Sequence, residues 1–307
     1  MVARRSISGT APSRRGRSAA RVLALVIDGA AAVGGRLPAW VTYRAAVVGG
    51  TLEWALRPRL RRRLAENLAR AIGRAPDDRV VKALVRREVV NEARRSADLL
   101  WSIGRPEEFR ETVVVSGREH VERAAARGRG VLLAGIHLGG WEVAAGVPAM
   151  VVPVPTTVVV ADDWLASGIQ HVRESLGLRV LRRREAALGA LRLLRRGEAL
   201  LVLGDDAWGD EPRMHRVEFC GVPAHLPAGI AALARLAGAP IVTFEVLPLG
   251  PRRWRVEVGA IIEPPPRDSG DDGERAVLQQ LADRWTDMIR RYPDQWAARF
   301  HIAWEAA

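Results

Sequence analysis

The 307-residue sequence contains only one cysteine, one lysine, four phenylalanines and two tyrosines. Because Cys220 is the single thiol, no disulfide can form within the chain, which is typical of a reducing compartment such as the bacterial cytoplasm. Because Lys82 is the single lysine, arginine supplies almost all of the positive charge. Abundant arginine, alanine, glycine and valine are typical of a GC-rich genome, which accounts for part of the net charge of +12.

The sequence also lacks an uninterrupted apolar stretch of the roughly 20 residues that a spanning helix needs. Residues 22–35 are apolar apart from Asp28, but no cleavage motif of a signal peptide follows them, and Arg36 comes next. The first 21 residues carry six arginines and no acid, so we expect residues 1–20 to be disordered. We expect residues 20–56 to form helices that lie in or against a bilayer surface; ordinary core helices are the alternative.

The basic charge is typical of a protein whose partners are anions, such as nucleic acid, anionic lipid headgroups or an acidic carrier protein. The basic residues are not interleaved with stacking aromatics, and the sequence contains no recognised nucleic-acid-binding motif. We therefore expect no nucleic-acid partner. A non-enzymatic protein that binds nucleic acid or an anionic membrane stays open as an alternative.

Two helices are predicted after this N-terminal region. Apolar residues recur at every fourth position from Leu56 to Ile72 with arginines on the other faces, which predicts an amphipathic helix that begins near Pro58. A second helix is predicted over residues 77–102, and Gly104-Arg105-Pro106 ends it.

From residue 105 onwards, short apolar runs alternate with helical patterns. The predicted strands are 112–115, 130–136, 156–160, 179–181, 199–203, 240–247 and 253–262. The predicted helices are 118–127, 140–150, 165–176, 185–196, 228–237 and 273–292. This alternation predicts an α/β fold with a mostly parallel central sheet flanked by helices. We expect one domain over residues 21–307, with a helical part (21–104) and an α/β catalytic core (105–307).

The strand predicted at 130–136 is followed by His137, Gly139, Gly140 and Glu142. A buried strand makes the histidine rigid, the glycines let a substrate approach the backbone, and the carboxylate can orient the imidazole and stabilise its charged form. Ligands in such folds collect at the carboxyl ends of strands, where Asp205 is also expected. The pattern therefore predicts a general-base site; a histidine that merely caps the next helix is the alternative.

The segment His137-Leu-Gly-Gly-Trp-Glu142 resembles the H-x4-D/E motif of glycerolipid-type acyltransferases. It is most similar to the version in the late acyltransferases of lipid A biosynthesis and the phosphatidylinositol mannoside acyltransferases. Further blocks resemble this family in the same order, and together they cover most of residues 20–304. They are Asn67-Leu68, Arg173-Glu-Ser-Leu-Gly177, Gly204-Asp205-Asp206, Val217-Glu218-Phe-Cys-Gly221, Pro227-Ala-Gly229, Gly238-Ala-Pro240 and Tyr292-Pro-Asp-Gln-Trp296.

The resemblance implies that His137 removes a proton from an acceptor hydroxyl during acyl transfer. Glu142 or Glu218, or both, would support it. The oxyanion would be stabilised by amides near Gly139 and Gly140 or by Arg173. The block at Asp205 would shape the acceptor pocket.

Several positions bear on how far the family pattern holds. Asp206 stands where the family carries Gln or Arg, and Gly140 stands where it usually carries Asn. Arg182 and Arg183 belong to a basic patch that suits coenzyme A phosphates, a carrier protein or lipid headgroups; a solvated charge run is the alternative. Cys220 stands at a phenylalanine position of the family, so we interpret it as a packing residue.

We expect no metal and no cofactor, since the acids and histidines near Asp205 show no recognised ligand spacing. The sequence thus predicts a peripheral acyltransferase at the cytoplasmic face of a bacterial membrane. It would use acyl-CoA or acyl carrier protein as donor and a glycolipid hydroxyl, phosphatidylinositol mannoside-like or lipid A-like, as acceptor, with anionic membrane lipids as partners. The alternative is an acyltransferase or thioester hydrolase that acts on a soluble or secondary-metabolite acceptor.

Overall fold

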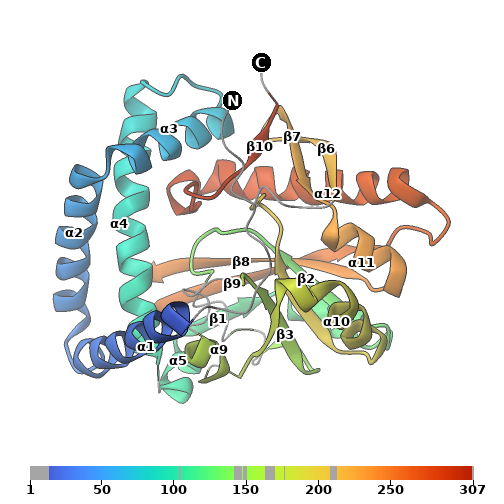
Figure 1. Cartoon of the computed structure of the whole chain (residues 1–307), viewed down its shortest axis with the longest axis horizontal. Helices are drawn as coiled ribbons and strands as arrows, with labels where there is room; N and C mark the ends of the chain where they lie inside the picture. Colours follow the sequence, from blue (N-terminus) through green and yellow to red (C-terminus); the bar gives the residue numbers. More distant parts are fainter. Residues whose placement is uncertain are drawn as a thin grey trace.

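In the computed structural model, the residues described are 14–103, 105–141, 147, 151–162, 170–175, 177–207 and 213–305. They form a mixed α/β fold around a seven-stranded sheet with the strand order β1-β9-β8-β2-β5-β3-β4 (Figure 1). The strands are β1 (Val113–Ser116), β2 (Val131–Gly135), β3 (Thr156–Val160), β4 (Arg179–Arg182), β5 (Ala199–Leu203), β8 (Ile241–Gly250) and β9 (Arg253–Ile262). Each of the seven strands predicted from alternation is confirmed.

Most of this sheet is parallel, as predicted. β8, β2, β5, β3 and β4 share one direction, whereas β9 is antiparallel to β8, and β1 is parallel to β9. All five residues of β2 are buried, which explains why this central strand is apolar throughout. The carboxyl ends of β2, β5, β3 and β4 therefore meet at one edge of the sheet, and residues that follow these strands are neighbours there.

Helices cover both faces of the sheet, and a hydrophobic core lies on each face. One core contains side chains of α10 (Arg183–Arg195), α11 (Gly229–Ala237) and α12 (Gly270–Arg291), and Figure 1 shows α12 running above the strands. The other core contains side chains of α5 (Pro106–Glu111), α6 (Arg118–Ala125) and α9 (Gln170–Ser175). The helix predicted at 140–150 falls almost entirely outside the described residues.

The N-terminal part is helical. It contains α1 (Arg14–Gly34), α2 (Ala39–Leu56), α3 (Pro58–Ile72) and α4 (Arg79–Ser102). α3 begins at Pro58, as predicted, and ends at Gly73 in a left-handed conformation; the Asp78 side chain caps α4 by accepting from the amide of Val80. α1 begins inside the segment that we expected to be disordered. Among the described residues, no helix combines the length and apolarity required to cross a membrane.

A second, antiparallel sheet was not predicted. It consists of β6 (Met214–Phe219), β7 (Val222–Pro227) and β10 (Ala303–Trp304), in the order β10-β7-β6. Its pairing brings the end of the chain beside β7, where Ala303 is opposite His225. The segment just before β10, residues 295–301, is thereby held close to the end of β2 and forms part of the candidate site.

Candidate active site

His137 lies two residues beyond the end of β2 and is fixed at the backbone by residues 295–297. The amide of Ala297 donates to the His137 carbonyl across 2.7 Å, and the amide of Gly139 donates to the Gln295 carbonyl across 2.8 Å. Leu138 and Trp296 form an isolated antiparallel bridge between these two segments. The loop after β2 therefore has little freedom, and the imidazole is held at the edge where the parallel strands end.

Asp205 is the carboxylate that contacts this histidine. It follows β5, the neighbour of β2, and Nδ1 of His137 lies 2.7 Å from its Oδ1. The backbone amide of His137 donates to both carboxylate oxygens at 3.1 Å, and the indole Nε1 of Trp296 donates to Oδ2 at 3.0 Å. Asp205 is completely buried. The tautomer that fits this contact carries its proton on Nδ1, which donates to Asp205, and in that tautomer Nε2 is the nitrogen that can accept a proton.

Two aromatic rings surround the imidazole. Phe300 stacks on it with ring centroids 3.8 Å apart, and Trp141 meets it edge-on at 4.8 Å. The same two rings contact one another at 6.0 Å. The His137 side chain is consequently almost covered, with about a tenth of its surface, 11 %, exposed. Apolar walls of this kind strengthen electrostatic interactions in the site and limit the entry of water.

Asp206 is also buried near the pair, but its contacts differ. One of its carboxylate oxygens, Oδ1, accepts from the backbone amide of His301 at 3.2 Å. Burial raises the pKa of Asp206 from 3.8 to about 6, an effect that the charge of His137 opposes and the charge of Asp205 reinforces. Asp206 thus anchors the C-terminal segment, whereas Asp205 contacts the histidine.

Helices α3 and α4 hold the segment that carries Phe300. The side-chain nitrogen of Asn67, Nδ2, donates to the carbonyls of Ala298 (2.7 Å) and Phe300 (3.2 Å). Its side-chain oxygen, Oδ1, accepts from Trp304 Nε1 at 2.8 Å. On α4, the fully buried Glu88 accepts from Arg299 at 3.4 Å. The N-terminal helices therefore position the wall of the site.

The buried charges beside this wall form a network. Glu88 lies between Arg299 and Arg95, at 3.4 Å and 3.6 Å, and Arg95 also pairs with Glu92 at 2.6 Å. Burial raises the pKa of Glu88 to about 7 although both arginines act in the opposite direction. This network ties α4 to the residue that directly precedes Phe300.

The two glycines after His137, Gly139 and Gly140, are held by backbone hydrogen bonds and by close neighbours. The amides of Gly139 and Gly140 donate to the carbonyls of Gln295 and Val246, each across 2.8 Å. The amides that we expected as oxyanion donors are thus already bonded in this structure. Gly139 has a φ of +62°, and a Cβ there would lie 1.9 Å from the Val246 carbonyl oxygen; a Cβ on Gly140 would lie 2.5 Å from the Trp254 ring.

Of the two carboxylates expected to assist His137, Glu142 lies outside the described residues. Glu218 lies on β6 with its side chain exposed. The amide of Glu218 donates to Gln279 Oε1 on α12, and Gln279 Nε2 donates to the Glu218 carbonyl. No hydrogen bond found between described residues joins the Glu218 side chain to the histidine. The catalytic roles of both glutamates stay predictions.

The arginines expected to bind substrate lie further along the same edge of the sheet. Arg173 is buried on α9, Arg182 ends β4, and Arg183 begins α10. Arg182 donates to Gln170 Oε1 and to the Ala161 carbonyl. β5 and β3 separate β4 from β2, and strands are spaced by about 4.8 Å, so the end of β4 is roughly 14 Å from that of β2.

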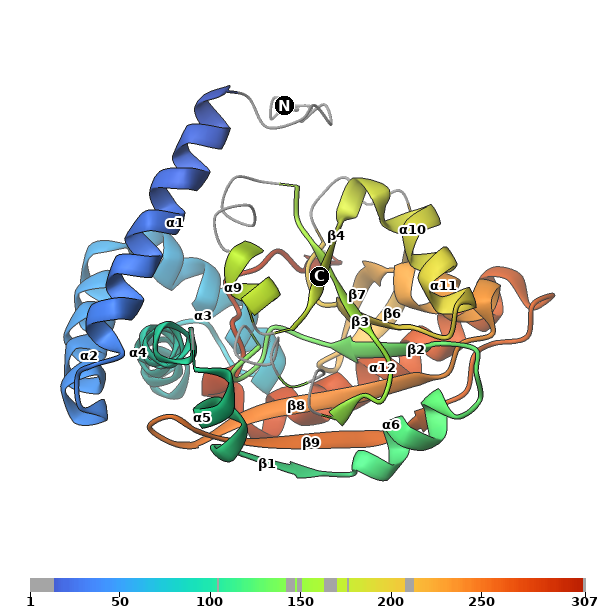
Figure 2. The ribbon, with the colours of Figure 1, turned by 90° about the horizontal axis from the view of Figure 1, so that it is seen from below.

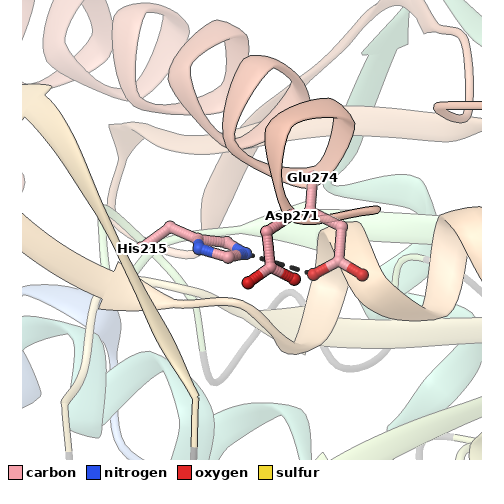
Figure 3. Close-up of side chains that lie close together, drawn as sticks. All are labelled: His215, Asp271 and Glu274. Carbon is pink, nitrogen blue, oxygen red and sulfur yellow. Dashed lines mark hydrogen bonds and ion pairs between the residues drawn. The ribbon is translucent and has the colours of Figure 1, made fainter. Parts of the chain in front are cut away.

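A cluster of His215, Asp271 and Glu274 brings three potential metal ligands together where β6 meets the start of α12 (Figure 3). The buried Glu274, however, already accepts from Arg213 (2.8 Å), Arg235 (2.8 Å) and His215 (3.1 Å). Burial opposes ionisation, but these three donors hold the pKa of Glu274 below its ordinary value. Two guanidinium groups on one carboxylate leave it poorly suited to a cation, so the cluster ties α12 to β6 and α11.

Cys220 is buried between β6 and β7, and its amide donates to Thr286 Oγ1. Burial raises the pKa of its thiol from 9.0 to about 12, which keeps the sulfur protonated. This environment agrees with the interpretation of Cys220 as a packing residue.

The fold and site together define an α/β protein with a buried His–Asp pair at the carboxyl ends of its parallel strands. Comparison with known families identifies the class further. The profile of the bacterial lipid A biosynthesis acyltransferase family matches residues 20–304. The chain belongs to this family and is therefore an acyltransferase, as its motifs predicted.

Two curated relatives are similar to the chain. A phosphatidylinositol mannoside acyltransferase of Mycolicibacterium smegmatis is 30 % identical over 262 residues, which cover 81 % of this chain and 82 % of the relative. A phosphatidylinositol mannoside acyltransferase of Mycobacterium tuberculosis is 30 % identical over 190 residues, 60 % of this chain and 57 % of the relative. The chain thus spans little more than half the length of this second relative.

Proposed function

We propose that this chain transfers a fatty acyl group from an acyl thioester, acyl-CoA or acyl carrier protein, to a hydroxyl group of a glycolipid. The observation that carries the proposal is the contact between Nδ1 of His137 and Oδ1 of Asp205 across 2.7 Å. A sugar or glycerol hydroxyl is a poor nucleophile at neutral pH, and an oriented neutral imidazole is suited to remove its proton.

In the proposed reaction, Nε2 of His137 takes the hydroxyl proton while the hydroxyl oxygen attacks the thioester carbonyl. The resulting tetrahedral intermediate collapses when the carbon–sulfur bond breaks, and the imidazolium returns its proton to the departing thiolate. Asp205 stabilises the imidazolium between these two steps and keeps the ring in one orientation. No acyl-enzyme is needed, in keeping with the buried, protonated thiol of Cys220.

The rings of Phe300 and Trp141 favour transfer over hydrolysis in this scheme. They cover the imidazole of His137 at 3.8 Å and 4.8 Å, which restricts the access of water to the base. A hydroxyl delivered by a bound acceptor then has an advantage over bulk water. A site with these walls argues against a simple thioester hydrolase.

The acceptor is proposed to be phosphatidylinositol mannoside-like or lipid A-like. The names of the two mycobacterial relatives support the first choice, and the family description supports the second. Arg173, Arg182 and Arg183 lie further along the edge of the sheet that carries His137, and they suit the phosphates of an anionic donor or headgroup.

The enzyme is further proposed to act as a peripheral protein at the cytoplasmic face of the membrane. α1 and α2 expose large apolar side chains, including Leu25, Val48, Leu52 and Leu56, which are 55–76 % exposed. Trp40, near the start of α2, is 61 % exposed and stacks with Arg44. Exposed apolar and aromatic side chains beside arginines are typical of helices that lie in the membrane interface.

The test is acyl transfer from radiolabelled palmitoyl-CoA or palmitoyl carrier protein to a membrane lipid extract. We expect a labelled lipid with the wild type and at least about a hundredfold less with His137→Ala, the scale of removing a general base. His225→Ala is the matched control, because His225 is partly exposed on β7, and it should retain wild-type activity. Free labelled fatty acid would favour a hydrolase or a soluble acceptor, and no turnover with either donor would overturn the proposal.

A further inference from the structure

The charged residues of α4 are divided between two faces. Glu88, Glu92 and Asp98 face the protein, where they pair with buried arginines or with Tyr43. Arg86, Arg87 and Arg94 lie on another face of the same helix, and Arg86 and Arg87 are exposed. Residues four apart in a helix lie one turn above one another, so positions 86, 90 and 94 form one row along α4. Positions 83, 87 and 91 form the adjacent row, and the two rows make one continuous surface.

This surface contains a cavity of about 410 Å³. Its lining is Ala83, Arg86, Arg87, Val90, Asn91 and Arg94. We call it the α4 groove. The cavity shares no lining residue with the candidate catalytic pair, although Asn91 in its lining donates to the Asp294 carbonyl at 3.1 Å.

Within the described residues, the arginines of the α4 groove pair with no carboxylate, and the neighbouring Asp294 carboxylate accepts instead from Asn91 Nδ2 at 3.4 Å. Arg86 stacks on Trp54 at 5.8 Å and Arg94 on Tyr43 at 5.9 Å, both rings belonging to α2. Arg94 also donates to Asn91 Oδ1 at 3.3 Å, while its buried Nε atom has no hydrogen-bond partner. Across the part of the chain that the structure describes, Arg86, Arg87 and Arg94 form no ion pair. Three guanidinium groups around one cavity repel one another, and a bound anion would relieve that repulsion.

The α4 groove lies next to helix α2, whose opposite face is apolar and exposed. α2 and α4 run side by side in both views, and they are so close that a Cβ on Gly50 would lie 2.9 Å from Cα of Val90 (Figures 1 and 2). Tyr43 and Trp54, on which the groove arginines stack, share the face of α2 that carries Gly50. Val48 and Leu52 are each two residues from Gly50, so their exposed side chains lie on the opposite face of α2, away from α4.

The depth of this groove relative to a membrane follows from helix dimensions. An interfacial helix buries its apolar face about 5–10 Å into the boundary between headgroups and acyl chains. The axes of packed helices are about 8–10 Å apart. If α2 lies in the interface, α4 and its arginines are one helix diameter further out, at the level of the phosphate groups.

We propose that the α4 groove binds the phosphate groups of anionic phospholipids. The proposal rests on the membrane association proposed above for α1 and α2, and it adds a defined headgroup site to it. Planar guanidinium groups bind phosphate through paired hydrogen bonds, and the aromatic rings beneath Arg86 and Arg94 hold two of the three in place. An acidic carrier protein is a less suitable occupant, because α2, the helix packed against α4, exposes apolar side chains on its far face as a membrane-facing helix does.

The experiment is vesicle flotation of the full chain. It compares vesicles of phosphatidylcholine alone with vesicles that also contain phosphatidylglycerol. We expect the triple variant R86Q/R87Q/R94Q to bind the anionic vesicles at least about tenfold more weakly than wild type, with little change on neutral vesicles. The effect should shrink as salt is raised, because exposed charges are screened.

The matched control is R192Q/R195Q/R196Q. These arginines lie in or just after α10, are exposed and, within the residues described, form no ion pair. The control removes the same net charge and should keep most of the affinity for anionic vesicles. The variant R86K/R87K/R94K keeps the charge and should bind far better than the glutamine variant, and R86Q/R87Q tests the site without altering Arg94 and its contact with Tyr43. Circular dichroism checks that each variant is folded.

Several outcomes overturn the proposal. Equal losses in the groove and control triples would mean that only net charge matters. Unchanged vesicle affinity in the groove triple, with lost binding to acyl carrier protein or to inorganic phosphate, would assign the groove to a soluble anion. Leu52→Ser should weaken binding to neutral and anionic vesicles alike. If the wild type floats with neither kind of vesicle, the membrane association fails together with this proposal, while acyl transfer in detergent still tests the catalytic one.

Discussion

The indole of Trp296 donates a hydrogen bond to the carboxylate of Asp205 across 3.0 Å, although 91 residues separate them in sequence. The same carboxylate accepts from the backbone amide of His137 and contacts its Nδ1. Three donors from two segments of the chain thus hold one buried carboxylate in a single orientation. The geometry of the candidate site depends on residues 295–301 being folded against the end of β2.

The first prediction concerns Asp205→Asn. An asparagine can donate to Nδ1, which stabilises the tautomer in which Nε2 carries the proton and cannot act as a base. We expect kcat to fall at least about a hundredfold with little change in KM, because the acceptor hydroxyl is still bound but no longer deprotonated. Steady-state acyl transfer at saturating acceptor measures this.

The variant Trp296→Phe tests how much activity depends on the orientation of the Asp205 carboxylate, separately from its contact with His137. It removes one donor to Asp205 and leaves the two contacts with His137 intact. We expect a loss of kcat of roughly tenfold, far smaller than for Asp205→Asn, since a single hydrogen bond is worth about 1–3 kcal/mol. Equal losses in the two variants would contradict the division of roles between them.

The fold could be predicted well from the sequence because its strands are short, apolar and separated by helical patterns. The second sheet was missed because β6 and β7 lack such an apolar run, and Pro223 and Pro227 argue against a strand. Pro223 is tolerated because the ladder between β10 and β7 includes only Ala224 and His225, so no amide is needed at residue 223, while the Pro223 carbonyl still accepts from the Glu305 amide.

The site was predicted in part. His137 and Asp205 could both be placed at strand ends, but their pairing depends on β2 and β5 being neighbours, which alternation of strands and helices does not specify. The contributions of Trp296, Phe300 and Asn67 could not be predicted, because each acts across more than 60 residues of sequence through tertiary contacts. Trp296 and Asn67 lie in family-like blocks, and those blocks were the available signal.

The second prediction concerns Asn67, which is buried on α3 and bonds to the segment that carries Phe300. Asn67→Ala removes two bonds to carbonyls and one from Trp304. We expect the free energy of unfolding to fall by about 2–4 kcal/mol, since buried partners are left unsatisfied. We also expect kcat to fall several-fold because Phe300 is less well held. Asn67→Asp should be worse than alanine, because it places a carboxylate against two carbonyl oxygens.

The third prediction concerns Gly140, a position at which the family resemblance implies an asparagine. A Cβ at this position would lie 2.5 Å from the ring of the buried Trp254. Gly140→Asn should therefore destabilise the protein by about 1–3 kcal/mol, as overpacking does, and lower its activity. Gly29→Asn is the control, because nothing lies within 4 Å of a Cβ at Gly29.

The explanation by overpacking has its own test. Trp254→Leu alone should destabilise the core, but combined with Gly140→Asn it makes room for the asparagine side chain. The double variant should then be more stable than the sum of the two single effects implies. Strict additivity, measured by thermal or denaturant unfolding, would show that the two side chains do not compete for the same space.

The last prediction concerns the dependence of stability on pH. Asp98 on α4 accepts from Tyr43 Oη at 2.6 Å and from the amide of Arg252 at 3.3 Å, and so links α2 to the turn between β8 and β9. Burial raises the pKa of Asp98 from 3.8 to about 6, although the bonds from Tyr43 and Arg252 act in the opposite direction. Between these two values the folded protein holds a proton that the unfolded chain has lost.

Because the folded state binds more protons in this range, its stability falls as pH rises from about 4 to 6. The contribution of Asp98 is fully present below the unfolded pKa and is lost as pH passes the folded pKa, a change of up to about 3 kcal/mol. The asparagine in Asp98→Asn does not titrate, so the free energy of unfolding of this variant should lack the fall between about pH 4 and 6 that Asp98 causes in the wild type. Urea unfolding of both proteins across this pH range measures the difference, and parallel curves for wild type and variant would refute the raised pKa of Asp98.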